Sequence, residues 1–192
     1  EMLFNDLAFL FLFLPLVLIV VMAICPRQLR PVALIFVSLL FYGFSGGLHV
    51  AVLFGGVVWV FLIVDKLFII KENKPALWLA ILGPLSALVY FKYAGFLISD
   101  VFFLDNSAGQ TFDLFQNMIL PAGISFFTFQ LIAYAIDRYR GEIAEPAGFT
   151  TLLLFVSFFP QLVAGPIVRF HQVAKNVVGL AEFRLTIPIV CE

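Results

Sequence analysis

Five polar side chains interrupt or border long apolar stretches of this sequence, namely Lys92, Gln130, Gln161, Arg169 and His171. Polar residues within apolar segments are energetically costly, so we consider these five as candidates for lining a channel or binding a substrate. An arginine can hold a carboxylate, a phosphate or an anionic headgroup through two parallel hydrogen bonds. Simpler interpretations stay open: Lys92 can extend to an aqueous surface, Gln130 can bond a neighbouring helix, and Arg169 can anchor the chain at an interface.

The two histidines have no neighbours that would make them catalytic. Neither His49, which we expect at an interface, nor His171 has a serine, cysteine or carboxylate at catalytic spacing, and a general base needs a partner that orients it. The sequence has no phosphate loop, dinucleotide fingerprint or zinc signature. Its two cysteines, Cys25 and Cys191, show no disulfide framework or metal-ligand spacing. We therefore predict no catalytic residue, no metal site and no bound cofactor in this chain.

The composition is that of an integral membrane protein. Of 192 residues, 63% are hydrophobic and only 12% are charged, and the mean hydropathy is +1.11. An average soluble domain is about half apolar and about one quarter charged. We therefore expect membrane lipids as neighbours and no nucleic-acid partner.

Six apolar segments approach the length of roughly 20 residues that a membrane-spanning helix needs. They cover about 7–24, 31–47, 48–64, 76–98, 118–136 and 149–165. The first lacks the basic flank and the cleavage site of a signal peptide, so we interpret it as a membrane helix. The fold class we predict is all-α. We expect one polytopic membrane domain over 1–192, built from about five to six hydrophobic helices and ending in an atypical tail, 172–192.

Basic residues occupy every second loop and therefore predict the orientation. They are Arg27 and Arg30 in 25–31, Lys66, Lys71 and Lys74 in 65–75, and Arg138 and Arg140 in 137–147. The loop 99–117 carries three aspartates and no basic residue. Because basic loops stay in the cytoplasm, we expect the three basic loops to be cytoplasmic, and 99–117 and the N-terminus to be extracytoplasmic.

The last apolar segment is broken by Pro160, Gly165 and Pro166. Proline lacks the backbone donor that a helix needs, and broken backbone within a membrane persists only where protein or water satisfies it. A full sixth span would also place the basic tail outside the cell. We therefore predict that 149–170 is re-entrant and packed inside the protein, with Gln161 bonding the freed backbone groups.

Several stretches resemble the membrane-bound O-acyltransferase family. They are "MLFNDLAFLFLFLPLV" at 2–17, "SLLFYG" at 38–43, "FKY" at 91–93, "LPAGISFFTFQLIAYAIDRYRGEI" at 120–143 and "FVSFFPQLVAGPIVRF" at 155–170. The resemblance covers about 1–171, and the last two stretches at this spacing are its most specific part.

The resemblance implies the N-terminal part of a larger helical ring around a funnel in the bacterial cytoplasmic membrane. It also implies acyl transfer, of acetyl by expectation, from a cytoplasmic thioester such as acetyl-CoA or an acyl-carrier protein. The implied acceptor is a hydroxyl of an extracytoplasmic polysaccharide such as alginate, and the implied partners include other acetylation proteins.

The family's catalytic histidine lies in a later motif of the type Trp-His-x-Ser, which this chain does not contain. We therefore expect the chain to be part of a longer protein and to be inactive alone. Two other functions stay open from the residues. Broken helices are also typical of a transporter or flippase, although no internal repeat is visible, and a membrane fragment without catalytic function is the third interpretation.

Overall fold

The computed structural model of the protein describes residues 11, 14–44, 46–67, 73–96, 121, 123–143, 145–158 and 169–170. Within these ranges every regular element is a helix, and no strand is present. The predicted all-α class is therefore confirmed for this part of the chain. Residues 159–168 and 171–192, including Pro160, Gln161, Gly165, Pro166 and His171, lie outside the described residues.

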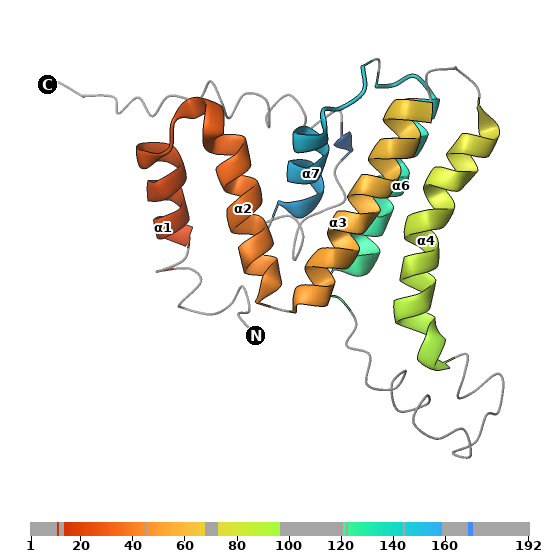
Figure 1. The fold of residues 1–192 in the computed structure, drawn as a ribbon, viewed down its shortest axis with the longest axis horizontal. Helices are drawn as coiled ribbons and strands as arrows, with labels where there is room; N and C mark the ends of the chain where they lie inside the picture. The colour runs from red at the N-terminus through yellow and green to blue at the C-terminus, as the bar shows by residue number, and fades with distance from the viewer. Residues whose placement is uncertain are drawn as a thin grey trace, which may run out of the picture.

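The helices follow one another in a simple order along the chain (Figure 1). They are α1 Leu14–Leu18, the π-helix η2 Ile19–Ile24, the 3-10 helix η3 Arg27–Leu29, α2 Arg30–Gly43, α3 Gly47–Phe61, the π-helix η4 Leu62–Leu67, α4 Lys74–Phe96, α6 Ile124–Tyr139 and α7 Phe149–Ser157.

Three of the predicted segments coincide closely with helices. The segment 31–47 corresponds to α2, in which Pro31 lies in the first turn, where the missing proline N–H has no helical partner to lose. The segment 48–64 corresponds to α3 continued by η4, and 76–98 corresponds to α4. Of the first segment, residues 14–24 are helical, as α1 and η2.

The prediction for 118–136 was displaced toward the N-terminus. The helix α6 begins only at Ile124, after Pro121 and a left-handed Gly123 with φ of 70°. It continues beyond Ile136 to Tyr139, so the charged pair Asp137 and Arg138 belongs to its last turn. Apolar composition marks where lipid-compatible residues lie, whereas hydrogen bonding decides where the helix begins and ends.

The helices alternate in direction between two ends of the molecule. As drawn in Figure 1, α3 and α6 end at the upper end, and α2, α4 and α7 begin there. The lower end holds the connection between α2 and α3 and the end of α4. The described parts of the three basic loops predicted to be cytoplasmic thus adjoin the upper end.

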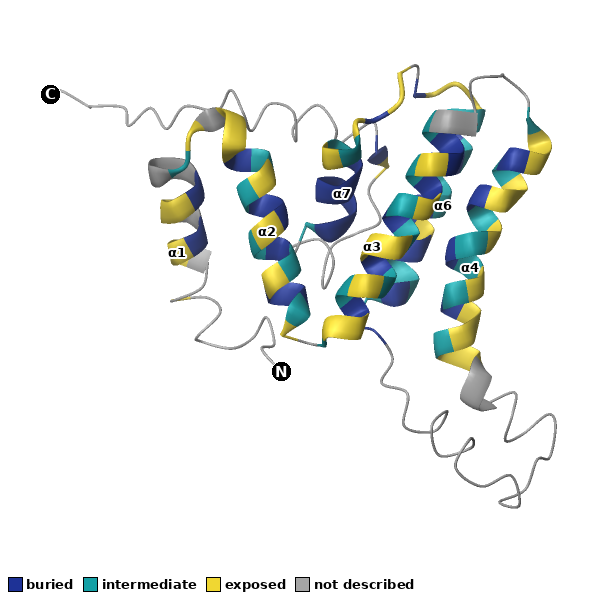
Figure 2. Ribbon diagram, viewed as in Figure 1, coloured by how far each residue is buried: buried dark blue, intermediate teal, exposed yellow. Residues whose placement is uncertain are grey.

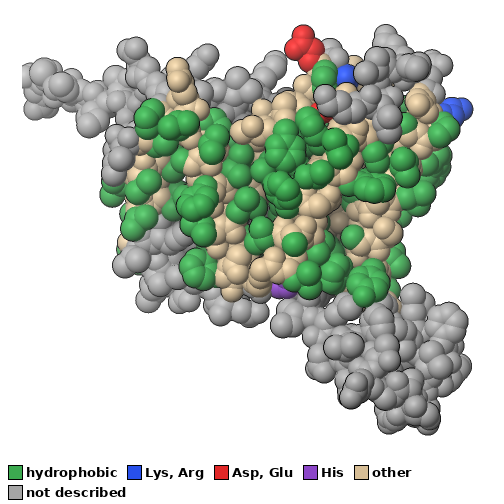
Figure 3. Space-filling view, in the orientation of Figure 1, with side chains coloured by type: hydrophobic (Ala, Val, Ile, Leu, Met, Phe, Trp, Pro, Cys, Tyr) green, Lys and Arg blue, Asp and Glu red, His purple; other side chains and the backbone are tan. Residues whose placement is uncertain are grey.

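Hydropathy and the placement of charged side chains distinguish the middle of the molecule from its upper end. Two helices have the length and hydropathy of a membrane span, Gly47–Asp65 and Lys74–Tyr93, with mean hydropathies of 2.4 and 1.4. Figure 3 shows a body covered by hydrophobic side chains, with acidic and basic side chains gathered at the upper end. By length and composition, these two helices could cross a membrane.

The short helix α7 is the most enclosed element. All residues from Leu152 to Ser157 are buried, and Figure 2 shows α7 with almost no exposed face. It packs against α2, α3 and α6. Its nine residues extend about 14 Å at 1.5 Å per residue, roughly half of a hydrocarbon core of about 30 Å.

The chain returns to the upper end after α7. Residues 169 and 170 lie beside the upper part of α7 (Figure 1), although α7 itself runs downward from Phe149. The ring of Phe170 packs against Phe155 in the second half of α7 and against Tyr134 of α6. The predicted re-entrant path itself runs through residues 159–168, which lie outside the described residues, and it stays a prediction.

Candidate functional site

Tyr134 forms the centre of a small polar cluster at the upper end. Its side chain is fully buried in α6. Its hydroxyl donates a hydrogen bond to Oδ1 of Asp65 at 3.2 Å and accepts one from the backbone N–H of Ala147 at 3.0 Å. The phenol therefore joins η4, α6 and the segment before α7, three parts of the chain that are distant in sequence.

Three further contacts hold residues 169 and 170 in place. The ring of Phe170 packs edge-on against Tyr134, with centroids 5.0 Å apart, and edge-on against Phe155 of α7, at 5.2 Å. The preceding residue, Arg169, forms an ion pair with Glu142, with Nη1 and Oε2 3.1 Å apart. Arg169 thus has a carboxylate partner, and its side chain is half-exposed.

The neighbouring turn is fixed by a hydrogen bond from Arg138. Its Nη1 donates to the carbonyl oxygen of Ile143 at 2.7 Å. Gly141, with φ of 78°, supplies the left-handed residue that lets the chain turn directly after α6. The segment 139–147 is therefore held on both sides, by Arg138 and by Tyr134.

Gln130 lies one turn below Tyr134 on the buried face of α6. The predicted shared face with Phe127 and Tyr134 is confirmed, since the three side chains are 2% exposed or less. The predicted helix–helix hydrogen bond is not present among the described residues, because neither amide atom of Gln130 has a partner. A buried amide without partners costs about 1–3 kcal/mol per unsatisfied group, so this one invites a functional explanation.

Of the other predicted site residues, only Lys92 is among the described ones, and it does not join this cluster. Lys92 is exposed near the lower end of α4, and its Nζ lies 5.4 Å from the ring centroid of Tyr93. This position suits a lysine that extends toward the membrane surface. Gln161 and His171, and the predicted helix break at Pro160, Gly165 and Pro166, lie outside the described residues.

His49, which we expected at a membrane interface, lies in the first turn of α3, and its side chain is buried within the protein. It is 4% exposed, its ring lies 6.1 Å from that of Tyr42, and its Nδ1 has no hydrogen-bond partner. It lies at the start of α3, at the lower end in Figure 1, whereas Tyr134 bonds Asp65 of η4, which follows the upper end of α3. No group of three potential metal ligands occurs among the described residues.

The sequence did not single out Tyr134, Asp65 or Phe170. Each lies in an apolar run or at its border, where tyrosine and phenylalanine are indistinguishable from lipid-facing bulk. The hydrogen bond between Tyr134 and Asp65 spans 69 residues of sequence, so no local periodicity reports it. Only the spacing of Gln130 and Tyr134 on one helix face gave a usable signal.

Comparison with known proteins gives this arrangement a context. The chain is 34% identical over 179 residues to a probable alginate O-acetylase of Pseudomonas syringae pv. tomato, and 34% identical over 182 residues to that of Pseudomonas aeruginosa. It is also 32% identical over 202 residues to a peptidoglycan O-acetyltransferase of Helicobacter pylori. The chain is a relative of the membrane-bound O-acyltransferases.

The matches cover most of this chain but only part of each relative. They include 91% of the chain for both alginate O-acetylases and 89% for the peptidoglycan O-acetyltransferase. The chain spans about a third of the length of these relatives, 34% to 38%. No family profile and no solved structure matches it.

Proposed function

We propose that this chain is a membrane-embedded segment of a polysaccharide O-acyltransferase. The complete enzyme transfers an acyl group, by resemblance acetyl, from a cytoplasmic thioester to hydroxyls of an extracytoplasmic polymer. The observation that carries the proposal is the match to alginate and peptidoglycan O-acetylating enzymes over about nine tenths of the chain. Acetyl-CoA or an acyl-carrier thioester is the donor in this proposal, and alginate or a related polymer is the acceptor.

In the bilayer, the upper end of the molecule faces the cytoplasm of a bacterial cell. The basic residues of 25–31, 65–75 and 137–147 support this orientation through the positive-inside preference. The helices are then an N-terminal portion of the polytopic ring that such an enzyme forms around its funnel. The N-terminus and the segment 99–117 lie on the extracytoplasmic side.

In this orientation α7 enters from the cytoplasmic side and the chain comes back to it. The pairing of Phe170 with Tyr134 and Phe155 supports the return. The polar Tyr134 cluster and the exposed part of Arg169 then lie on the side from which the thioester donor approaches. Gln130, buried one turn deeper in α6, is our candidate for a side chain that lines the path between donor and acceptor.

This portion supplies structure and substrate contacts but no general base. Acyl transfer requires a group that takes the proton of the attacking hydroxyl and a partner that orients that group. None of the described residues offers such a pair. We therefore expect the isolated chain not to transfer acetyl groups; turnover of acetyl-CoA by the purified chain that disappears in His171→Ala would contradict this.

A chimera tests the proposed function. The matching stretch of the Pseudomonas aeruginosa alginate O-acetylase is replaced by residues 1–171 of this chain, and the acetyl content of alginate is measured in cells lacking their own enzyme. We expect acetylated alginate. A chimera present in the membrane fraction at the level of the parent enzyme, but leaving alginate unacetylated, would overturn the proposal.

A further inference from the structure

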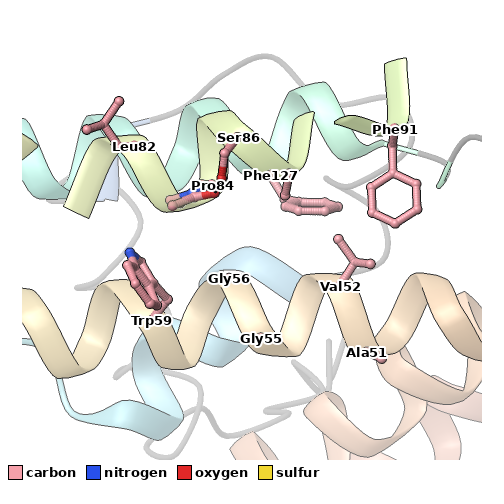
Figure 4. A pocket seen from close by; sticks show the side chains of 12 residues that line it. Ala51, Val52, Gly55, Gly56, Trp59, Leu82, Pro84, Ser86, Phe91 and Phe127 are labelled. Atoms are coloured by element: carbon pink, nitrogen blue, oxygen red, sulfur yellow. Dashed lines mark hydrogen bonds between the residues drawn. The ribbon is translucent and has the colours of Figure 1, made fainter. Parts of the chain in front are cut away.

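A cavity of about 550 Å³ lies between α3 and α4, away from the Tyr134 cluster. Figure 4 shows Trp59 of α3 toward one end, Phe91 of α4 toward the other, and Phe127 of α6 between the helices. The walls between them are made mainly of small residues, which keep the space open: Ala51, Gly55, Gly56, Gly83, Ser86 and Ala87.

Two glycines define the shape of this cavity in different ways. A Cβ on Gly55 would meet no atom within 4 Å, so this glycine borders open space. A Cβ on Gly83 would overlap the indole ring of Trp59. Gly83 therefore allows Trp59 to lie directly on the backbone of α4 and to close one end of the cavity.

The polar groups of the cavity are already satisfied within the protein. Nε1 of Trp59 donates to the carbonyl oxygen of Leu79 at 3.0 Å, and the hydroxyl of Ser86 donates to the carbonyl oxygen of Gly83 at 2.8 Å. No charged side chain is among the lining residues. A sugar, an ion or a thioester headgroup would lose its hydration here without replacement, which costs several kcal/mol per polar group.

The cavity opens onto an apolar surface and runs along the helices. The large exposed side chains that line it, Trp59 and Leu82, are hydrophobic and are 43% and 53% exposed. Both walls belong to the two helices with the length and hydropathy of a membrane span. From Val52 to Trp59 the slot extends about 10 Å along the axis of α3, the direction in which lipid chains lie in a bilayer.

We propose that the cavity between α3 and α4 binds one alkyl chain of a membrane lipid. This inference rests on the membrane placement proposed above but not on acyl transfer. The apolar walls, the internally satisfied polar groups and the axial shape all select an alkyl chain over a polar ligand. The opening toward the hydrocarbon region gives such a chain direct access.

Quenching of Trp59 fluorescence tests the proposal. Trp78→Phe leaves Trp59 as the single tryptophan, and the full chain is reconstituted in phosphatidylcholine vesicles with or without bromine atoms at the middle of the acyl chains. We expect brominated lipid to quench Trp59 strongly. Gly55→Leu fills the cavity and should reduce this quenching at least two-fold, and Ala51→Leu should reduce it in the same direction.

Gly47→Leu is the matched control, because Gly47 also has no atom within 4 Å of an added Cβ and does not line the cavity. It should leave quenching unchanged. Equal quenching in all variants would mean that Trp59 meets only bulk lipid, and absence of quenching would mean that protein closes the cavity; either result overturns the proposal. Flotation of the vesicles reports membrane insertion separately, and the chimera reports acyl transfer.

Discussion

Tyr134 is the residue whose single hydroxyl joins the most distant parts of the chain. Replacing it with phenylalanine retains the ring against Phe170 but leaves the N–H of Ala147 and an oxygen of Asp65 without this partner. We expect Tyr134→Phe to lower the free energy of unfolding by about 1–3 kcal/mol, the cost of burying polar groups that lose their hydrogen bonds.

Thermal unfolding in detergent measures this effect, and Tyr93→Phe is the matched control. Tyr93 is 44% exposed, and phenylalanine keeps its ring beside Lys92. The control should change the stability by less than about 0.5 kcal/mol. Equal effects of the two substitutions would show that the hydroxyl of Tyr134 does not hold the upper end together.

Replacing Gln130 should not lower the stability, in contrast to replacing Tyr134. Neither of its amide atoms has a partner among the described residues, so Gln130→Leu removes a desolvated polar group without breaking a hydrogen bond seen there. We expect equal or higher thermal stability, because apolar replacement of an unsatisfied buried group is neutral or stabilising. A decrease of more than about 1 kcal/mol would reveal a partner for this amide and would contradict the structure.

Among single residues, the sequence identified those that are chemically unusual for their surroundings. Gln130 was found because a glutamine in an apolar run is conspicuous, and its helical spacing placed it correctly on the buried face. Tyr134 was not found, because its role depends on Asp65 and Ala147, which reach it only through the tertiary fold. Chemical type is visible in a sequence, whereas such partners are not.

The element that most distinguishes this fold is the short helix α7 with the returning chain. Phe170 is 5% exposed and packs between Tyr134 and Phe155, whereas its neighbour Arg169 is exposed. We expect Phe170→Ala to cost about 3–5 kcal/mol through the lost packing and the cavity it leaves. Arg169→Ala should cost only about 0–1 kcal/mol, since an exposed ion pair contributes little.

Thermal unfolding of the two neighbouring variants in the same detergent provides the comparison. Because they differ by one position, any general effect of changing this segment is shared. A loss in Arg169→Ala as large as that in Phe170→Ala would show that the ion pair with Glu142, rather than the aromatic contact, holds the returning chain.

At the scale of elements, the prediction of a helix start succeeded where a proline marks it. Pro31 marks the start of α2, whereas the predicted break from Pro160 to Pro166 lies outside the described residues and stays a prediction. The start of α6 was misplaced because 118–123 is as apolar as the helix itself. The π-helical turns η2 and η4 were also not anticipated, since they arise from backbone hydrogen bonding that apolar composition does not report.

For the whole molecule, labelling of single cysteines tests the orientation. In a chain with Cys25 and Cys191 changed to serine, we expect Asp105→Cys to react with a membrane-impermeant maleimide in intact spheroplasts. Glu145→Cys, exposed near the upper end, should react only after permeabilisation. The opposite labelling pattern would show that the predicted sides are reversed. It would mean that the basic residues of the loops do not set the orientation of this chain.

The alternation of basic loops predicted which connections share one end of the molecule, and the structure brings them together (Figure 1). The cavity between α3 and α4 was not predictable, because Trp59 and Gly83 meet only when two helices pack. Charge placement is recorded in the sequence directly. The shape of a cavity between two helices depends on how the helices pack, so the sequence does not reveal it directly.

The return of the chain after α7 links the fold to the proposed function, and its side of the membrane can be read directly. Reporters fused after Leu180 distinguish the two sides: we expect a fluorescent protein to be bright and alkaline phosphatase to be inactive, as for a cytoplasmic position. Pro160→Leu combined with Pro166→Leu should favour a continuous span and activate the phosphatase. An active phosphatase on the unaltered chain would contradict the re-entrant arrangement and would place Arg169 outside the cell, away from any thioester donor.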